Sequence, residues 1–63
     1  MPISARKMEM EILADGWIFK SQVGSHKNYV HPLKPGKVAI PFHKGHDLSL
    51  NTERSIRKQA GLL

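Results

Sequence analysis

Sixty-three residues suffice for one domain with a thin core, and we expect residues 1–63 to form it, since so short a chain buries only about 60% of its unfolded surface. The absence of cysteine excludes disulfides and thiolate metal sites, and no apolar run suggests a signal peptide or membrane span, so we expect a cytoplasmic protein without membrane contact. A formal net charge of +5 favours an anionic partner, either nucleic acid or an acidic protein.

A helix is predicted from Ser4 to about Asp15. Ser4 is a favourable N-cap residue, and Met8 and Ile12 follow at helical spacing. Gly16 then supplies the left-handed residue that commonly closes a helix. The first element is therefore predicted to be amphipathic and helical.

Three strands are predicted after this helix. The first begins at Trp17, the second spans residues 26–31 and the third spans residues 37–41. Turns are expected at residues 23–25 and 33–36, which are rich in glycine, serine and proline. Such short connections predict an antiparallel meander.

A loop and a second helix are predicted to complete the chain. Asn51 or Thr52 can cap this helix, and Ile56, Ala60 and Leu63 are predicted to face inward. Its cationic residues are expected to remain solvated: Arg54, Arg57 and Lys58.

The predicted fold class is α+β, with the element order α-β-β-β-α. A three-stranded antiparallel sheet exposes one apolar face, and two amphipathic helices on that face are sufficient to cover it. We expect four large apolar residues in the resulting core and assign them no binding role: Trp17, Phe19, Ile40 and Ile56.

The excess positive charge lies in one segment of the chain. Residues 16–46 contain five lysines, all four histidines and no acidic residue, whereas the balance is −1 in residues 1–15 and +1 in residues 47–63. Clustered cations create a field that attracts phosphates, which favours nucleic acid over an acidic protein as the partner. The candidate RNA-binding residues are Lys20, Lys27, Lys37, Lys44, Arg54, Arg57 and Lys58.

His26 is the candidate catalytic residue, at the start of the second predicted strand and directly after Gly24 and Ser25. RNA carries its own nucleophile, the 2′-hydroxyl, so cleavage needs proton transfer from that group and to the departing 5′-oxygen, without a metal ion. An imidazole suits these transfers because its unperturbed pKa is about 6.5. Lys27 or Lys44 could supply positive charge near the phosphate. A histidine after a turn is nevertheless more often a structural or merely exposed residue.

The other histidines are weaker candidates. His31 and His43 lie beside or near prolines and are interpreted as loop-edge structure, while His46 can pair with Asp47. Their spacing, without thiolates, does not match a zinc site, and no phosphate-binding loop precedes a helix. We therefore predict no metal ion and no cofactor.

Several short motifs occur in an order and spacing typical of one known family. They are Gly16-Trp17, Gly24-Ser25-His26 followed by Tyr29 and His31-Pro32, Pro41 with His43, and the closing Ser55-Ile56-Arg57-Lys58-Gln59-Ala60-Gly61-Leu62. Over nearly its whole length the chain thus resembles the HicA family of toxins, the RNA-cleaving members of type II toxin-antitoxin pairs.

The resemblance implies a fold like the double-stranded RNA-binding domain, metal-independent cleavage of mRNA, and a catalytic histidine at the Gly-Ser-His position, here His26. It also implies a HicB-like antitoxin that binds this surface in a toxin-antitoxin hetero-oligomer and blocks the histidine. The group that acts opposite His26 is left unidentified. Two alternatives remain open: a non-catalytic RNA-binding module of the same fold, and a subunit whose lysines bind an acidic protein.

Overall fold

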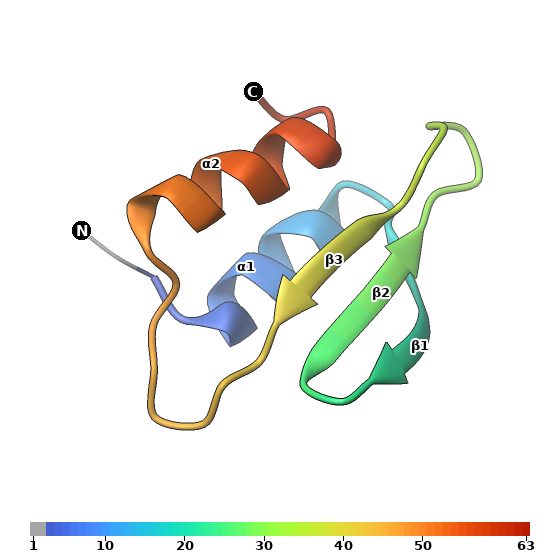
Figure 1. Cartoon of the computed structure of the whole chain (residues 1–63). Helices are drawn as coiled ribbons and strands as arrows, with labels where there is room; N and C mark the ends of the chain where they lie inside the picture. The colour runs from blue at the N-terminus through green and yellow to red at the C-terminus, as the bar shows by residue number, and fades with distance from the viewer. Residues whose placement is uncertain (1–2) are drawn as a thin grey trace.

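The structure, a computed structural model, describes residues 3–63, and its elements follow the predicted order (Figure 1). They are helix α1 (Ala5–Ala14), strands β1 (Ile18–Val23), β2 (His26–Val30) and β3 (Val38–Pro41), and helix α2 (Leu50–Gln59). Within the described residues, no helix is long and apolar enough to cross a membrane.

The sheet is an antiparallel meander with β2 at its centre, in the order β1-β2-β3. Tyr29 of β2 pairs with Phe19 on one side and with Val38 on the other. The β1–β2 register shifts between Phe19 and Ser21, so Lys20 is an extra residue in a β-bulge. Because of this extra residue, Ser21 and Val23 lie on the face opposite to that of Phe19, although simple alternation would place all three on one face.

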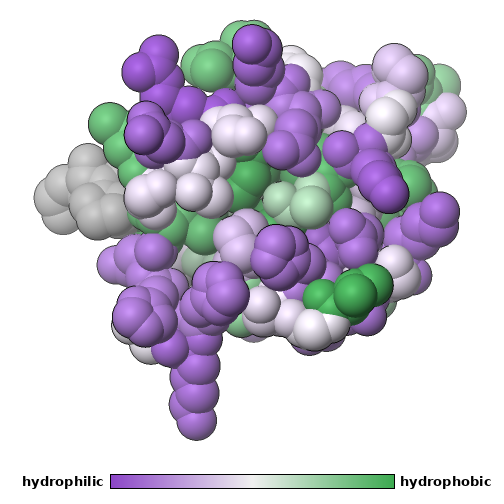
Figure 2. Space-filling model, viewed as in Figure 1, coloured by the Kyte–Doolittle hydropathy of each residue, from purple (hydrophilic) through white to green (hydrophobic). Residues whose placement is uncertain are grey.

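Both helices lie on the same face of the sheet, which gives the predicted two layers (Figure 1). Trp17, Ile40 and Ile56 are buried between the layers, as predicted. Hydrophilic side chains cover most of the face shown in Figure 2, and hydrophobic ones show in its middle and in separate places around its edge. The complete set of buried apolar residues is Ala5, Met8, Ile12, Trp17, Tyr29, Val38, Ile40, Leu48, Ile56 and Ala60.

Two residues predicted to be buried are exposed. Phe19 is 49% exposed because β1 is an edge strand, and within residues 3–63 the helices make their main sheet contacts with β3 and not with β1. Its ring lies in a T-shaped arrangement with the ring of Tyr29 on the central strand, with centroids 6.0 Å apart. Leu63 is 71% exposed because α2 ends at Gln59. Both core predictions were wrong.

The N-cap of α1 is the predicted one, whereas that of α2 lies earlier than predicted. The Ser4 side chain accepts a hydrogen bond from the Lys7 amide at 3.1 Å. In α2 the cap is Ser49, whose hydroxyl oxygen accepts from the Thr52 amide at 3.2 Å. Thr52 therefore occupies the first turn, and the prediction of Asn51 or Thr52 as the cap was wrong.

A polar contact beneath the sheet was not predicted. Tyr29 is fully buried, and its hydroxyl donates to Glu9 Oε2 on α1 at 2.6 Å. Burial and this carboxylate both raise the pKa of Tyr29. The hydrogen bond satisfies the hydroxyl and joins α1 to the central strand.

The two helices are joined by an ion-pair network centred on Arg57. Its guanidinium donates to both carboxylate oxygens of Glu11, at 2.7 and 3.1 Å, and to Glu53 at 3.2 Å. Glu53 is only 3% exposed and also accepts a bond from the Ile3 amide at 3.3 Å. Arg57 is therefore not the freely solvated residue that its helical position predicted.

Candidate active site

His26 is the first residue of β2, and the backbone fixes its position from both sides. It pairs with Val23 of β1 and with Pro41 of β3. The preceding turn contains Gly24 at a φ of 60°, a conformation that glycine adopts without steric cost. A Cβ at Gly24 would meet no atom within 4 Å, so backbone conformation, and not lack of space, favours glycine here.

The His26 side chain lies on the face of the sheet that the helices do not cover. Tyr29 is buried toward the helices, and alternation places Lys27 on that same face. Lys27 Nζ accordingly lies 3.8 Å from Glu9 Oε2 of α1. His26 and Asn28 must then point to the opposite face, and His26 is exposed there. An exposed imidazole on an open surface is accessible to a large substrate.

His43 lies beside His26, although the sequence suggested only a loop-edge role for it. The ring centroids are 6.2 Å apart, with an angle of 85° between the ring planes. Pairing between β2 and β3 continues one residue beyond the strand, because the Phe42 amide donates to the Ser25 carbonyl at 2.6 Å. Antiparallel pairing of the second and third predicted strands, continued by one residue, is the signal that could have identified this neighbour.

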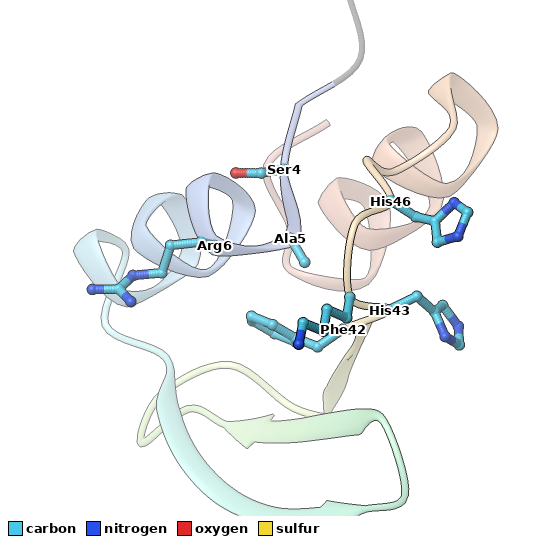
Figure 3. Close-up of a pocket in the computed structure, with 7 residues that line it drawn as sticks. Ser4, Ala5, Arg6, Phe42, His43 and His46 are labelled. Atoms are coloured by element: carbon cyan, nitrogen blue, oxygen red, sulfur yellow. The ribbon is translucent and has the colours of Figure 1, made fainter.

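A pocket of about 340 Å³ lies next to this histidine pair, between the start of α1 and the loop after β3. Figure 3 shows Phe42 directed toward α1, while the rings of His43 and His46 project away from it. The lining residues are Ser4, Ala5, Arg6, Phe42, His43, Lys44 and His46, which include no carboxylate. Arg6 was not among the predicted RNA-binding cations, because residues 1–15 carry no excess positive charge.

The predicted RNA-binding cations do not form one surface. Lys44 follows His43 directly, and Lys27 is near the same end of the sheet, but the Lys27 ammonium lies over the Phe42 ring at 4.2 Å. Lys37 precedes β3 and is therefore at the opposite end from His26. Lys20 is exposed in the β1 bulge.

The three cations of α2 belong to the helix layer, on the side of the sheet that His26 faces away from. Arg54 and Lys58 are exposed, so they are free to contact an anionic partner of that layer. The Arg57 guanidinium is occupied by Glu11 and Glu53. RNA contact by these three residues stays a prediction, and for Arg57 the ion pairs argue against it.

His31 has a structural role, in agreement with its interpretation from the sequence. Its Nδ1 accepts from the amides of Leu33 and Lys34 at 3.0 and 3.1 Å, so Nε2 carries the proton and donates to the Asp15 carbonyl at 2.9 Å. A Cβ at Gly16 would lie 2.8 Å from this Nε2, which explains the glycine before Trp17. Both ring nitrogens of His31 are thus engaged in holding the β2–β3 loop against the end of α1.

Within residues 3–63, no group of three or more histidine and acidic side chains is placed to hold a metal ion. His46 and Asp47 are both exposed, and none of the ion pairs found in that part of the chain joins them. The expected pairing of these two neighbours is therefore not seen.

The chain matches a known protein family. The family described as HicA toxin of bacterial toxin-antitoxin matches residues 5–62, nearly the whole chain. Comparison with curated proteins finds no match. The matched region contains both helices, the whole sheet and both histidines of the pair. The chain therefore belongs to the HicA family of toxins, and as such it is the toxin of a toxin-antitoxin pair.

Proposed function

We propose that this toxin is a metal-independent endoribonuclease that cleaves mRNA, with His26 as a general acid/base. The observation that carries the proposal is an exposed histidine whose backbone is paired with a strand on each side, on the face of the sheet left free by the helices. Catalytic groups on rigid elements keep their geometry better than groups on loops. Because mRNA is the proposed substrate, the proposed site of action is the cytoplasm.

Cleavage of this kind uses only groups that RNA and the protein supply. The 2′-oxygen attacks the adjacent phosphorus, its proton passes to a base, and the bond from phosphorus to the 5′-oxygen breaks as that oxygen receives a proton. The products are a 2′,3′-cyclic phosphate and a 5′-hydroxyl. Positioned proton transfer typically contributes about 10²- to 10⁴-fold to the rate. Lys44, which directly follows His43 and is exposed, is available to offset negative charge on the phosphate.

We further propose that the antitoxin partner is HicB-like and binds over the open face of the sheet. This face presents apolar side chains to solvent: Val23, which pairs with His26, is 71% exposed, and Ile18 is 55% exposed. A protein that covered these residues would also cover His26. The neighbouring reading frame should encode this antitoxin, and its product should co-purify with the toxin as a hetero-oligomer.

The function is tested with purified protein and RNA in the presence of a chelator. Wild-type protein should produce fragments that end in a cyclic phosphate, whereas His26→Ala should remain folded and bind RNA without cutting it. Cleavage by His26→Ala at the wild-type rate would refute the assignment. Wild-type binding without any product would instead support the non-catalytic RNA-binding module.

A further inference from the structure

We propose that His43 is the second proton-transfer group of this site, the acid that protonates the departing 5′-oxygen while His26 accepts the proton of the 2′-hydroxyl. This assignment rests on the proposed ribonuclease function. It supplies the group opposite His26, which neither the sequence motifs nor the family match identifies.

The separation of the two rings fits a shared phosphate. Their centroids are 6.2 Å apart and their planes are nearly perpendicular, so the rings are not stacked on one another. Each nitrogen must come within about 2.6–3.2 Å of the oxygen whose proton it moves. Both side chains are exposed, and exposed side chains change rotamer within nanoseconds, so both can turn toward a bound phosphate group.

The backbone keeps the two histidines together. The Ser25 carbonyl accepts the Phe42 amide at 2.6 Å, and His26 and His43 are the residues that follow these two hydrogen-bonded partners. His26 also pairs with Pro41 in the β2–β3 ladder. The separation of the two backbone positions is therefore set by strand pairing and not by a long loop.

Two other groups that the sequence offered for proton transfer or charge are already engaged in the fold. Both ring nitrogens of His31 hold backbone groups, and the Lys27 ammonium lies between Glu9 and the Phe42 ring. Within residues 3–63, neither His26 nor His43 takes part in an ion pair. Both imidazoles of the pair are thus free to exchange protons with a substrate.

The proton balance of the step follows from this pairing. His26 begins neutral and takes the 2′-hydroxyl proton as the 2′-oxygen bonds to phosphorus. His43 begins as an imidazolium and gives its proton to the 5′-oxygen as the bond from phosphorus to that oxygen breaks. After the step, His26 is protonated and His43 is neutral, and no other reactant is consumed.

A sulfur substitution in the substrate tests the role of His43. The bond cleaved by wild-type protein is mapped first, and an RNA is then made with sulfur in place of the 5′-bridging oxygen of that bond. A thiolate leaves without a proton, so this substrate does not need the acid. We expect His43→Ala to cut ordinary RNA about 10²- to 10⁴-fold more slowly than wild type and to recover nearly the wild-type rate on the sulfur substrate. His26→Ala should be slow on both.

The pH profile gives a second readout of the same role. An acid must be protonated to act, so wild-type activity should fall toward alkaline pH. His43→Ala, assayed on ordinary RNA, should lose this alkaline fall. The matched control is His46→Ala, which removes an exposed imidazole from the same loop and should leave the rate unchanged.

Each adverse outcome has a distinct meaning. Wild-type cleavage together with an unimpaired His43→Ala overturns the assignment of His43 alone, as does equal impairment of His43→Ala on both substrates. If His46→Ala loses as much cleavage rate as His43→Ala, the assignment is also overturned, because the loss is then not specific to the His26–His43 pair. Failure of wild-type protein to cut any RNA overturns both this assignment and the proposed function.

Discussion

The guanidinium of Arg57 in α2 donates two hydrogen bonds to the carboxylate of Glu11 in α1, at 2.7 and 3.1 Å. A third bond, at 3.2 Å, reaches Glu53, whose side chain is only 4% exposed. One cation thus satisfies a buried carboxylate and joins the two helices, in a domain whose core is thin.

Removing this cation should destabilise the fold. Arg57→Ala leaves the buried Glu53 carboxylate without its charged partner, and we expect a loss of about 2 kcal/mol in the free energy of unfolding. Urea denaturation measures it. Arg54→Ala, at an exposed position of the same helix, should change the free energy by no more than about 0.5 kcal/mol. Equal losses in the two variants would show that the network does not stabilise the domain.

Acid should weaken the same contact. The hydrogen bond from Arg57 lowers the pKa of Glu11 from its ordinary value of 4.5, so the folded state binds fewer protons than the unfolded state in this range. The stabilisation is fully present above pH 4.5 and is lost as the pH falls through the lower pKa of the folded state. Melting temperatures measured from pH 7 to pH 3 should therefore fall more steeply for wild type than for Glu11→Gln. Added salt should reduce the difference, because the pair is partly exposed.

Two glycines of the family motifs should differ in their tolerance of a methyl group. Gly16 has a φ of 103°, and an added Cβ would lie 2.8 Å from His31 Nε2. We expect Gly16→Ala to lose about 2–3 kcal/mol of unfolding free energy, from backbone strain together with the clash. Gly24→Ala has the strain without the clash and should lose about 1 kcal/mol. Chemical denaturation of both variants makes the comparison, and the reverse order would contradict the proposed role of His31 as a fixed structural group.

The position of each cation should decide its share of RNA binding. Lys44 follows His43, whereas Lys58 lies on α2 in the layer that His26 faces away from. Lys44→Ala should therefore weaken binding of single-stranded RNA and reduce the slope of log affinity against log salt by about 0.7, the value for one lost phosphate contact. Lys58→Ala should reduce the slope by less, because its layer faces away from His26. Titrations at several salt concentrations, using the non-cleaving His26→Ala background, measure both effects.

The amino-acid sequence by itself determined the order of the elements, the cap of α1 and the position of His26 after a glycine turn. It also identified His31 as a structural residue. These features depend on local signals, because helical spacing, strand alternation and turn residues act over a few neighbouring positions. The order and spacing of the short motifs from Gly16 to Leu62 together gave the resemblance to the HicA family, which the family match then confirmed.

Only the tertiary structure decided which side chains meet across the fold. Phe19 alternates correctly for a core residue, yet it is exposed because its strand lies at the edge of the sheet. Arg57 looked like a solvated helical cation until α1 placed Glu11, 46 positions earlier, against it. His43 is near His26 because the β2–β3 register brings them together. Contacts between residues so far apart in the chain depend on how the helix and sheet layers pack. The hydrophobic periodicity of a single segment does not determine that packing.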